Sequence, residues 1–206
     1  MDSTHFAVFP SNLGWMSLVW NDRRLVELTF GHPSAAESAR ATRCRSASPG
    51  DPLGTTAELW IARLQAYAHG EHSDNFLDVD LDVTGLTEFQ QKVLRACRRI
   101  PAGRTVTYGE LARRAGHPQA ARAAGQVMAT NRFPLIVPCH RVVAAGGLLG
   151  GYSAPQGLAM KRRLLADEGV TRFGRPASSS PVVKSSSPVV KAQRSPARGA
   201  APPIVP

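Results

Sequence analysis

Hydrophobic and polar positions in the first third of the chain predict a small sheet. Three short segments are rich in β-branched and aromatic residues, as strands are: Phe6–Phe9, Trp15–Trp20 and Leu25–Phe30. Asn21-Asp22 predicts a turn between the second and third strands. The polar, low-complexity stretch at 33–56 predicts a loop.

A helix and a further strand are predicted next. Ala57–His69 has helical spacing and stops at Gly70, and its apolar positions are Leu59, Ala62, Leu64 and Tyr67. Between residues 77 and 83, apolar residues alternate with three aspartates, which predicts a half-buried strand with an acidic face. These aspartates (Asp78, Asp80 and Asp82) also suggest a metal site, but an exposed face that they keep solvated is favoured.

The pattern changes to helices at Thr87. The apolar residues Phe89, Val93, Cys97 and Ile100 follow helical spacing, and Cys97 is interpreted as a small buried hydrophobic residue. Thr107-Tyr-Gly-Glu110 predicts a capping box, in which the Thr hydroxyl accepts from a helical amide and the Glu reaches back to the cap. That helix is expected to end near Ala115, before Gly116.

The next helix, predicted over Pro118–Thr130, would complete a helix-turn-helix unit. Within it, the segment QAARAAGQVMA consists almost entirely of small residues, and Arg122 is its only charge. Small side chains allow a helix backbone to lie close to another surface, either a neighbouring helix or a nucleic acid groove. The groove is favoured because the region is basic.

Charge is distributed unevenly along the chain. Residues 1–84 carry a net charge of −5, residues 85–170 carry +9 and residues 171–206 carry +6, which together give the net charge of +10. A basic second part favours a polyanionic partner, most often nucleic acid, although a solvated basic face remains an alternative.

The last 36 residues contain seven Pro and seven Ser, and the segment SSSPVVK at 178–184 repeats at 185–191. Pro181 and Pro188 are incompatible with the interior of a coiled coil. This composition predicts a disordered basic extension, which either adds electrostatic affinity for DNA or is a passive tail.

Several classes of protein are excluded by composition. No apolar run approaches the roughly 20 residues of a membrane span, and the N-terminus lacks the features of a signal peptide. The three cysteines (Cys44, Cys97 and Cys139) are widely spaced, which argues against a disulfide framework and a cysteine-rich zinc site. We therefore expect a cytoplasmic protein without a membrane association or a bound metal.

Candidate chemistry lies in the segment from Asn131 to Val143, where an apolar run precedes Cys139-His140. A cysteine is a nucleophile as its thiolate, which needs a nearby base or positive charge. Adjacent side chains of an extended segment point to opposite faces, so a contact here requires a turn or a bridging water. Alternatives are a buried structural cysteine beside a surface histidine, or two ligands of a metal site for which no further ligands have a recognisable spacing.

The segment Pro138-Cys-His-Arg-Val142 resembles the O6-alkylguanine-DNA alkyltransferases, also called methylated-DNA–protein-cysteine methyltransferases. The resemblance covers about residues 85–170 and includes, in the family's order, FQQKV, GRTVTYGELA, AARAAGQVMATN, VPCHRVV, GGY and KRRLLADEG. It implies an α/β (α+β) fold with a strand-rich, ribonuclease H-like supporting domain at 1–84. A helical catalytic domain with a helix-turn-helix would follow at 85–170, before the tail at 171–206.

The resemblance also implies direct-reversal DNA repair. Cys139 would accept the alkyl group of O6-alkylguanine as a stable thioether, once per molecule, with O4-alkylthymine as a second candidate substrate. His140 would act as a base through water, and Glu168 would orient it. Asn131 would bridge the turn before the active-site segment, and Tyr108 would assist nucleotide rotation and protonation of the leaving group.

Substrate contacts are implied in the same way. Backbone groups of Val142 and Ser153 would read the extruded base, and Tyr152 would line its pocket. Arg122 would fill the gap in the base stack, which offsets part of the cost of extrusion. The small-residue helix would enter the minor groove of duplex DNA, where little sequence is read. We expect a monomer that needs no cofactor.

Two departures from the family pattern bear on this expectation. Arg132 stands where the family usually has proline, and it could add a phosphate contact while making the segment less rigid. The loop at 153–157 is longer than the usual Gly-rich version, which is expected to alter the pocket rim.

Other classes of protein make different demands on the sequence. A regulatory DNA-binding protein would need larger polar residues on the second helix of the helix-turn-helix, and an alkyltransferase-like damage sensor would lack the acceptor Cys139. A cysteine hydrolase would need a base in direct reach and an oxyanion hole, and would turn over repeatedly. The combined regulator-repair proteins of the family have a cysteine-rich zinc domain, which three scattered cysteines exclude.

Overall fold

The computed structural model describes residues 3–171, apart from 22, 45–46, 51 and 53–54. Residues 1–176 belong to one compact unit. The predicted tail lies outside the described residues except for Thr171. The predicted boundary at residue 84 falls inside this unit and stays a prediction.

The three predicted strands are confirmed as β1 (His5–Phe9), β2 (Trp15–Trp20) and β3 (Leu25–His32). They form an antiparallel meander, and a short β4 (Ser48–Pro49) adds to β1 in parallel, giving the order β3-β2-β1-β4. At the predicted turn, the Asn21 amide donates to the Arg24 carbonyl at 3.1 Å, whereas Asp22 lies outside the described residues.

The prediction of a loop over 33–56 is wrong, because this stretch contains β4 and the helix α1 (Ala35–Ala41). Ser34 caps the helix by accepting from the Glu37 amide. Among the residues of α1, the buried one is Ser38, whose hydroxyl lies 2.8 Å from that of Ser17 on β2. A helix that buries a paired hydroxyl instead of an apolar stripe gives no hydrophobic periodicity to detect.

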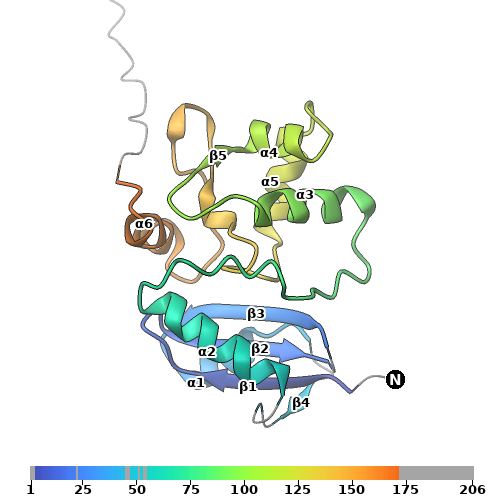
Figure 1. Cartoon of the computed structure of the whole chain (residues 1–206), viewed down its shortest axis with the longest axis vertical. Helices are drawn as coiled ribbons and strands as arrows, with labels where there is room; N and C mark the ends of the chain where they lie inside the picture. Colours follow the sequence, from blue (N-terminus) through green and yellow to red (C-terminus); the bar gives the residue numbers. More distant parts are fainter. Residues whose placement is uncertain (1–2, 22, 45–46, 51, 53–54, 172–206) are drawn as a thin grey trace, which may run out of the picture. The chain divides into compact units, whose positions relative to one another are not determined.

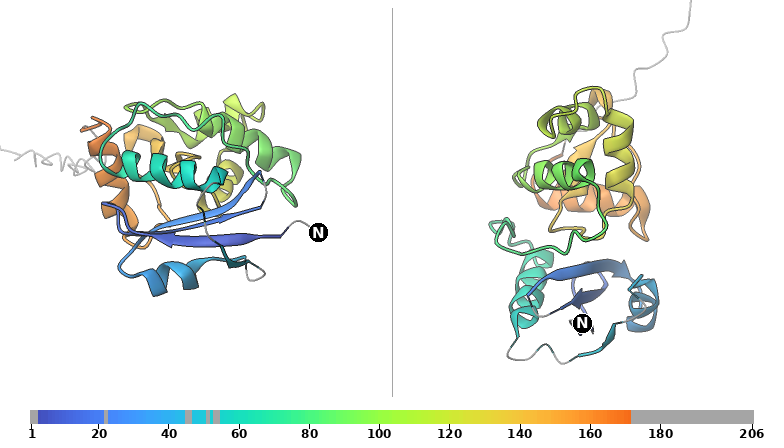
Figure 2. Two further views of the ribbon diagram at one scale, coloured as in Figure 1. Left: turned by 60° about the horizontal axis from the view of Figure 1, so that its bottom comes forward. Right: turned by 90° about the vertical axis from the view of Figure 1, so that its right-hand side faces the viewer.

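The predicted helix at 57–69 is confirmed as α2 (Thr56–Ala68), but its buried face differs from the expected one. Trp60, Leu64 and Tyr67 are buried, whereas Leu59 is 57% exposed. α2 and α1 lie on opposite faces of the sheet (Figures 1 and 2). The sheet is therefore covered by a helix on both sides.

The predicted strand at 77–83 is wrong, since its only ladder contact among the described residues is an isolated bridge between Leu81 and Leu25. The Asp74 carboxylate accepts from the Phe76 amide and holds a turn in which Phe76 has a φ of 52°. The Arg98 guanidinium donates to the carbonyls of Phe76 and Val79. These carbonyls are therefore bonded to an arginine instead of a neighbouring strand.

The predicted helices of the second part are confirmed as α3 (Glu88–Arg98), α4 (Tyr108–Arg114) and the final α6 (Gly157–Asp167). A complete capping box occurs at Thr87 and Gln90, before α3. At α4, Thr107 accepts from the Glu110 amide as predicted. The Glu110 carboxylate does not reach back to the cap, because it pairs with Arg114 one turn later.

The second helix of the helix-turn-helix, α5 (Ala121–Ala129), begins three residues after the predicted start at Pro118. Its first residue follows Ala120, which provides no side-chain cap. α4 and α5 pack together and against α3 (Figure 1). A short parallel pair, β5 (Val106–Thr107) with β6 (Val142–Val143), joins the start of α4 to the segment after Cys139.

Buried side chains from the sheet, α2, α3, α4, α5 and α6 form one continuous hydrophobic cluster. The outer edge of β3 is closed by bonds from the Leu25 amide to the Asp80 carbonyl and from the Leu28 amide to the Arg132 carbonyl. In the described part of the chain, every helix is too short or too polar to cross a membrane.

Candidate active site

Cys139 and His140 lie in a single turn of 3-10 helix, η1 (Cys139–Arg141). The extended conformation considered for this segment is therefore wrong, because the chain turns after Pro138, whose carbonyl accepts from the Arg141 amide at 2.9 Å. Cys139 is 6% exposed and His140 is fully buried. The turn lets two adjacent side chains serve one site.

Asn131 fixes the segment that precedes this turn. Its Oδ1 accepts from the Phe133 amide at 3.0 Å, and its Nδ2 donates to the Val137 carbonyl at 3.0 Å. The two bonds close a loop in which Leu135 has a φ of 70°. The same side chain lines a cavity beside Cys139.

The Glu168 carboxylate, at the C-terminal end of α6, is the centre of a buried polar network. Its Oε1 lies 2.9 Å from His140 Nε2 and accepts from the Tyr67 hydroxyl at 2.7 Å. Arg141 donates to the same carboxylate through Nε and Nη2. Burial alone would raise the pKa of the Glu168 carboxyl, but hydrogen bonds from His140 and Arg141 outweigh burial and hold its pKa far below the ordinary value.

This network determines which nitrogen of His140 carries the proton. Nε2 faces a carboxylate, so it is the N–H donor, and Nδ1 keeps the lone pair. Nδ1 is buried and has no hydrogen-bond partner among the described residues. Burial lowers the pKa of His140 although Glu168 opposes the shift, so the imidazole is neutral at pH 7 and able to accept a proton.

Tyr67 and Arg141 were missed as members of the site. The spacing of Tyr67 predicts a place on the core face of a helix, where a buried hydroxyl needs a partner that the sequence does not identify. Arg141 is an arginine inside an apolar run, and such a charge requires a buried counter-ion. That was the available signal, but the partner, 27 positions away, could be found only in the fold.

Lys161 is a third residue that the sequence reading did not assign. Lys161 lies near the middle of α6, and its buried ammonium donates to the carbonyls of Val142, Leu149 and Gly151. Three donors match three carbonyls, so this residue holds both ends of the loop after β6. Burial lowers the pKa of Lys161 to about 8.

The surroundings of the Cys139 thiol have opposing effects on its pKa. Burial raises its pKa, and the neighbouring Asn131 amide, Lys161 ammonium and Tyr152 hydroxyl act in the opposite direction. The thiol is therefore protonated at rest and needs a base to become a nucleophile.

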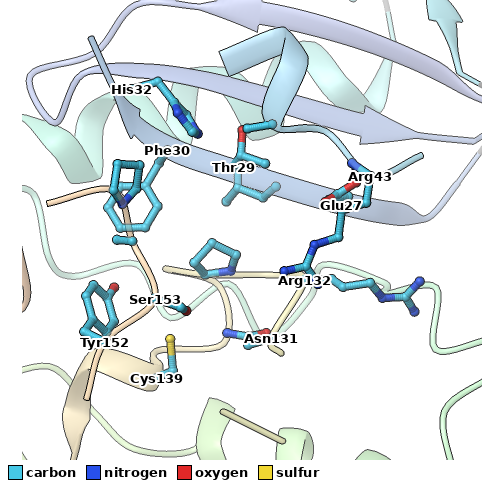
Figure 3. Close-up of a pocket in the computed structure, with 15 residues that line it drawn as sticks. Glu27, Thr29, Phe30, His32, Arg43, Asn131, Arg132, Cys139, Tyr152 and Ser153 are labelled. Carbon is cyan, nitrogen blue, oxygen red and sulfur yellow. Dashed lines mark hydrogen bonds between the residues drawn. The ribbon is translucent and has the colours of Figure 1, made fainter. Parts of the chain in front are cut away.

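Two cavities meet at Cys139. One, of about 390 Å³, is lined by Tyr108, Gly125, Met128, Ala129 and Gly151–Ser153. The other, of about 230 Å³, lies between Cys139 and the sheet strand β3, and Figure 3 shows the Cys139 sulfur directed toward it. Tyr152 and Ser153 line both cavities.

The residues expected to contact DNA lie on several segments, of which the helix-turn-helix provides Tyr108 and Arg122. Tyr108 is the first residue of α4 and lines the larger cavity. Arg122 is exposed on the first turn of α5. The Arg132 guanidinium donates to the Asp82 carbonyl at 3.0 Å, a contact within the protein, so its role as a phosphate contact stays a prediction. Val142 is buried, and its carbonyl is the one bonded to Lys161.

Within the described ranges, no three His, Cys, Asp or Glu side chains gather in a way that would hold a metal ion. The Asp74 and Asp78 carboxylates are instead paired with Arg63.

Comparison with known proteins defines the class. The family model for the 6-O-methylguanine DNA methyltransferase DNA-binding domain matches residues 88–170. A methylated-DNA–protein-cysteine methyltransferase of Mycolicibacterium paratuberculosis is 45% identical over 108 residues, which are 52% of this chain and 62% of that protein. The bifunctional transcriptional activator/DNA repair enzyme Ada of Escherichia coli is 31% identical over 166 residues, 81% of this chain and 46% of that protein.

Solved structures extend the similarity to both parts of the fold. Mycobacterium tuberculosis OGT in complex with DNA has 36% identity and a TM-score of 0.64, covering 80% of this chain and 93% of that one. The O6-methylguanine-DNA methyltransferase from Pyrococcus kodakaraensis has 26% identity and a TM-score of 0.59, with 81% and 99% covered. The chain therefore belongs to the O6-alkylguanine-DNA alkyltransferase family. The matched segment spans about three fifths of the length of the curated mycobacterial relatives.

Proposed function

We propose that this protein repairs DNA by moving the alkyl group from O6 of guanine to Sγ of its own Cys139. The observation that carries the proposal is the arrangement of Cys139 beside a neutral His140, whose Nε2 is held by Glu168 and whose Nδ1 has no partner among the described residues. Duplex DNA containing an alkylated base would be the substrate, and the reaction would take place in the cytoplasm.

The proton of the thiol would leave first. A water between Sγ and Nδ1 would carry it to His140, and the Glu168 carboxylate would stabilise the imidazolium that forms. Because burial disfavours both a free thiolate and a free imidazolium, the fixed negative charge of Glu168 is the element that makes this transfer favourable.

The thiolate would then attack the carbon bonded to O6. A bond forms between sulfur and carbon as the bond between carbon and O6 breaks, and the electron pair of that bond stays on the base. The departing guanine would take one proton. Tyr108, which lines the larger cavity, would supply it, and burial raises the pKa of this phenol and keeps it protonated until then. The proton that the thiol gave to His140 would return through water to the Tyr108 phenolate, so both residues regain their starting state.

The thioether formed on Cys139 would not be hydrolysed by the side chains around it, so the free thiol would not be regenerated. Each molecule would therefore act once. Asn131 would hold the nucleophile's segment in place, and backbone groups of Ser153, which lines the larger cavity, would read the base. The part of Val142 in reading the base stays a prediction, because its carbonyl accepts from Lys161 and it does not line that cavity. The base would enter the larger cavity, whose α5 wall consists of Gly125, Met128 and Ala129. Arg122, exposed on the same helix, would occupy the gap that the base leaves in the stack.

The test is mass spectrometry of the protein after incubation with a duplex that contains one O6-methylguanine. We expect one added methyl group on the peptide that holds Cys139, with saturation at one per protein. Cys139→Ala should show none, and Cys97→Ala, which changes another buried cysteine, should still be methylated. Lesion-selective binding without transfer would instead support the damage-sensor alternative, and repeated turnover would support a hydrolase.

A further inference from the structure

The smaller cavity beside Cys139 has no role in the transfer of a methyl group. A methyl carbon needs only the sulfur on one side and O6 on the other. In-line attack places those two atoms on opposite sides of the reacting carbon. The rest of a longer alkyl chain must therefore extend sideways from that carbon. The space for it has to adjoin the sulfur without being the space that holds the base.

The 230 Å³ cavity meets this requirement. Figure 3 shows the Cys139 sulfur pointing toward it, with Ser153 and Asn131 beside the cysteine. Its far wall is β3, through Leu28, Thr29 and Phe30, and its sides include Pro134, Ala41 and Pro155. The lining includes the apolar side chains of Leu28, Phe30, Pro134 and Pro155, which suit an alkyl chain.

The charged and titratable groups that line this cavity differ in whether they already have partners within the protein. Glu27 is buried, and its Oε2 accepts from the amides of Arg43 and Cys44 at 2.8 and 3.2 Å. The Arg132 guanidinium donates to the Asp82 carbonyl, and burial lowers the pKa of His32, which is neutral at pH 7. Arg43 is exposed, and no acceptor for its guanidinium exists among the residues that the structure describes.

We propose, on the basis of the proposed function, that this cavity receives the distal part of long O6 substituents and that Arg43 binds a carboxylate at their end. The substrate class is thus O6-alkylguanine with a chain of several carbons that ends in an anion. A guanidinium binds a carboxylate through paired hydrogen bonds, whereas an equally long apolar chain gains no such contact.

The experiment compares single-turnover rates on three duplexes that carry O6-methyl-, O6-butyl- or O6-(3-carboxypropyl)guanine. The wild-type protein should react at least fivefold faster with the carboxypropyl than with the butyl substrate. Arg43→Met keeps the alkyl stem, and it should bring that ratio close to one without changing methyl transfer. Arg40→Met changes an exposed arginine on α1 outside the cavity and should leave all three rates unchanged.

The cavity itself is tested by narrowing it with Ala41→Leu. Transfer of butyl and carboxypropyl groups should slow at least fivefold, and transfer of methyl should be unaffected. An unchanged substrate ratio in Arg43→Met, or equal effects of Ala41→Leu on all three substrates, would overturn the inference. Absence of methyl transfer in the wild-type protein would instead overturn the proposed function.

Discussion

The two sides of Cys139 are built on opposite principles. On the Glu168 side, donors from Tyr67, His140 and Arg141 converge on one buried carboxylate. On the side of the larger cavity, the wall that α5 provides consists of Gly125, Met128 and Ala129, which have no polar side-chain group.

This difference separates two kinds of contribution. In a buried ionic network, removing one charge leaves its partners unpaired, so stability and reactivity should fall together. The α5 wall of the larger cavity borders space for a ligand, and filling that space should reduce reactivity without loss of stability. The substitutions below test whether the two sides behave in these distinct ways.

The largest effect is expected from Glu168→Gln. Arg141 would be left buried without a counter-charge, which typically costs about 3–5 kcal/mol of stability. The loss of base catalysis should slow methyl transfer by about a hundredfold or more. Urea unfolding and single-turnover kinetics measure the two effects. Glu110→Gln, which breaks an exposed pair with Arg114, serves as the control and should cost less than about 1 kcal/mol.

The same carboxylate predicts a dependence of stability on pH. The pKa of Glu168 is held below its unfolded value by His140 and Arg141, although burial opposes the shift. The stabilisation is therefore present above about pH 4.3 and is lost as the pH falls toward the folded pKa. Unfolding free energies measured between pH 6 and 2.5 should decline more steeply in the wild-type protein than in Glu168→Gln. Equal slopes would show that the carboxylate is not charge-stabilised.

Lys161→Met should have the next largest effect. Three carbonyls that hold the loop from Val142 to Gly151 would lose their donor, which should destabilise the protein and slow transfer. The folded pKa of about 8 lies below the ordinary value of 10.5, so the unfolded chain binds a proton more firmly over that range. Wild-type stability therefore contains a term that rises with pH from 8 to 10.5. Melting temperatures measured between pH 8 and 10.5 should therefore lack this rise in the Lys161→Met variant.

The sequence was sufficient where a local pattern and the tertiary environment agree. The strands at 6–30 and the apolar face of α3 have such patterns, and Cys139 and His140 stand in a motif. It was insufficient at residues 77–83, where alternation predicts a strand. There, Arg98 from a distant helix binds the carbonyl of Val79, and also that of Phe76 just before the segment.

Other parts of the site could not be predicted for a related reason. Tyr67 and Glu168 are 101 positions apart, and neither residue carries a local signal of the other. The helix α1 was missed because its buried residue is a serine that pairs with another serine. A pattern of hydrophobicity does not report polar groups that are buried in pairs.

Gly125→Ala tests the open side of Cys139 and should change stability and activity in opposite directions. An added Cβ would meet Tyr108 at 3.7 Å, an ordinary contact, and alanine in a helix is favoured over glycine by about 0.5–1 kcal/mol. The methyl group would occupy part of the cavity proposed for the base, so transfer should slow by an amount that kinetics can resolve. Gly109→Ala in α4 is the matched control, since its Cβ lies outside that cavity and transfer should be preserved.

The smallest effect is expected at Thr87, which belongs to neither side of Cys139. Its hydroxyl accepts from the Gln90 amide at 3.3 Å and caps α3, and loss of such a cap costs about 1 kcal/mol. Thr87→Ala should lower the unfolding free energy by that amount, and Thr87→Ser should restore most of it. Methyl transfer should be unchanged in both variants because the cap contacts neither the Glu168 network nor the cavities. Slower transfer in Thr87→Ala would show that the two sides of the site are coupled to general stability, and that their separation is less complete than the contacts imply.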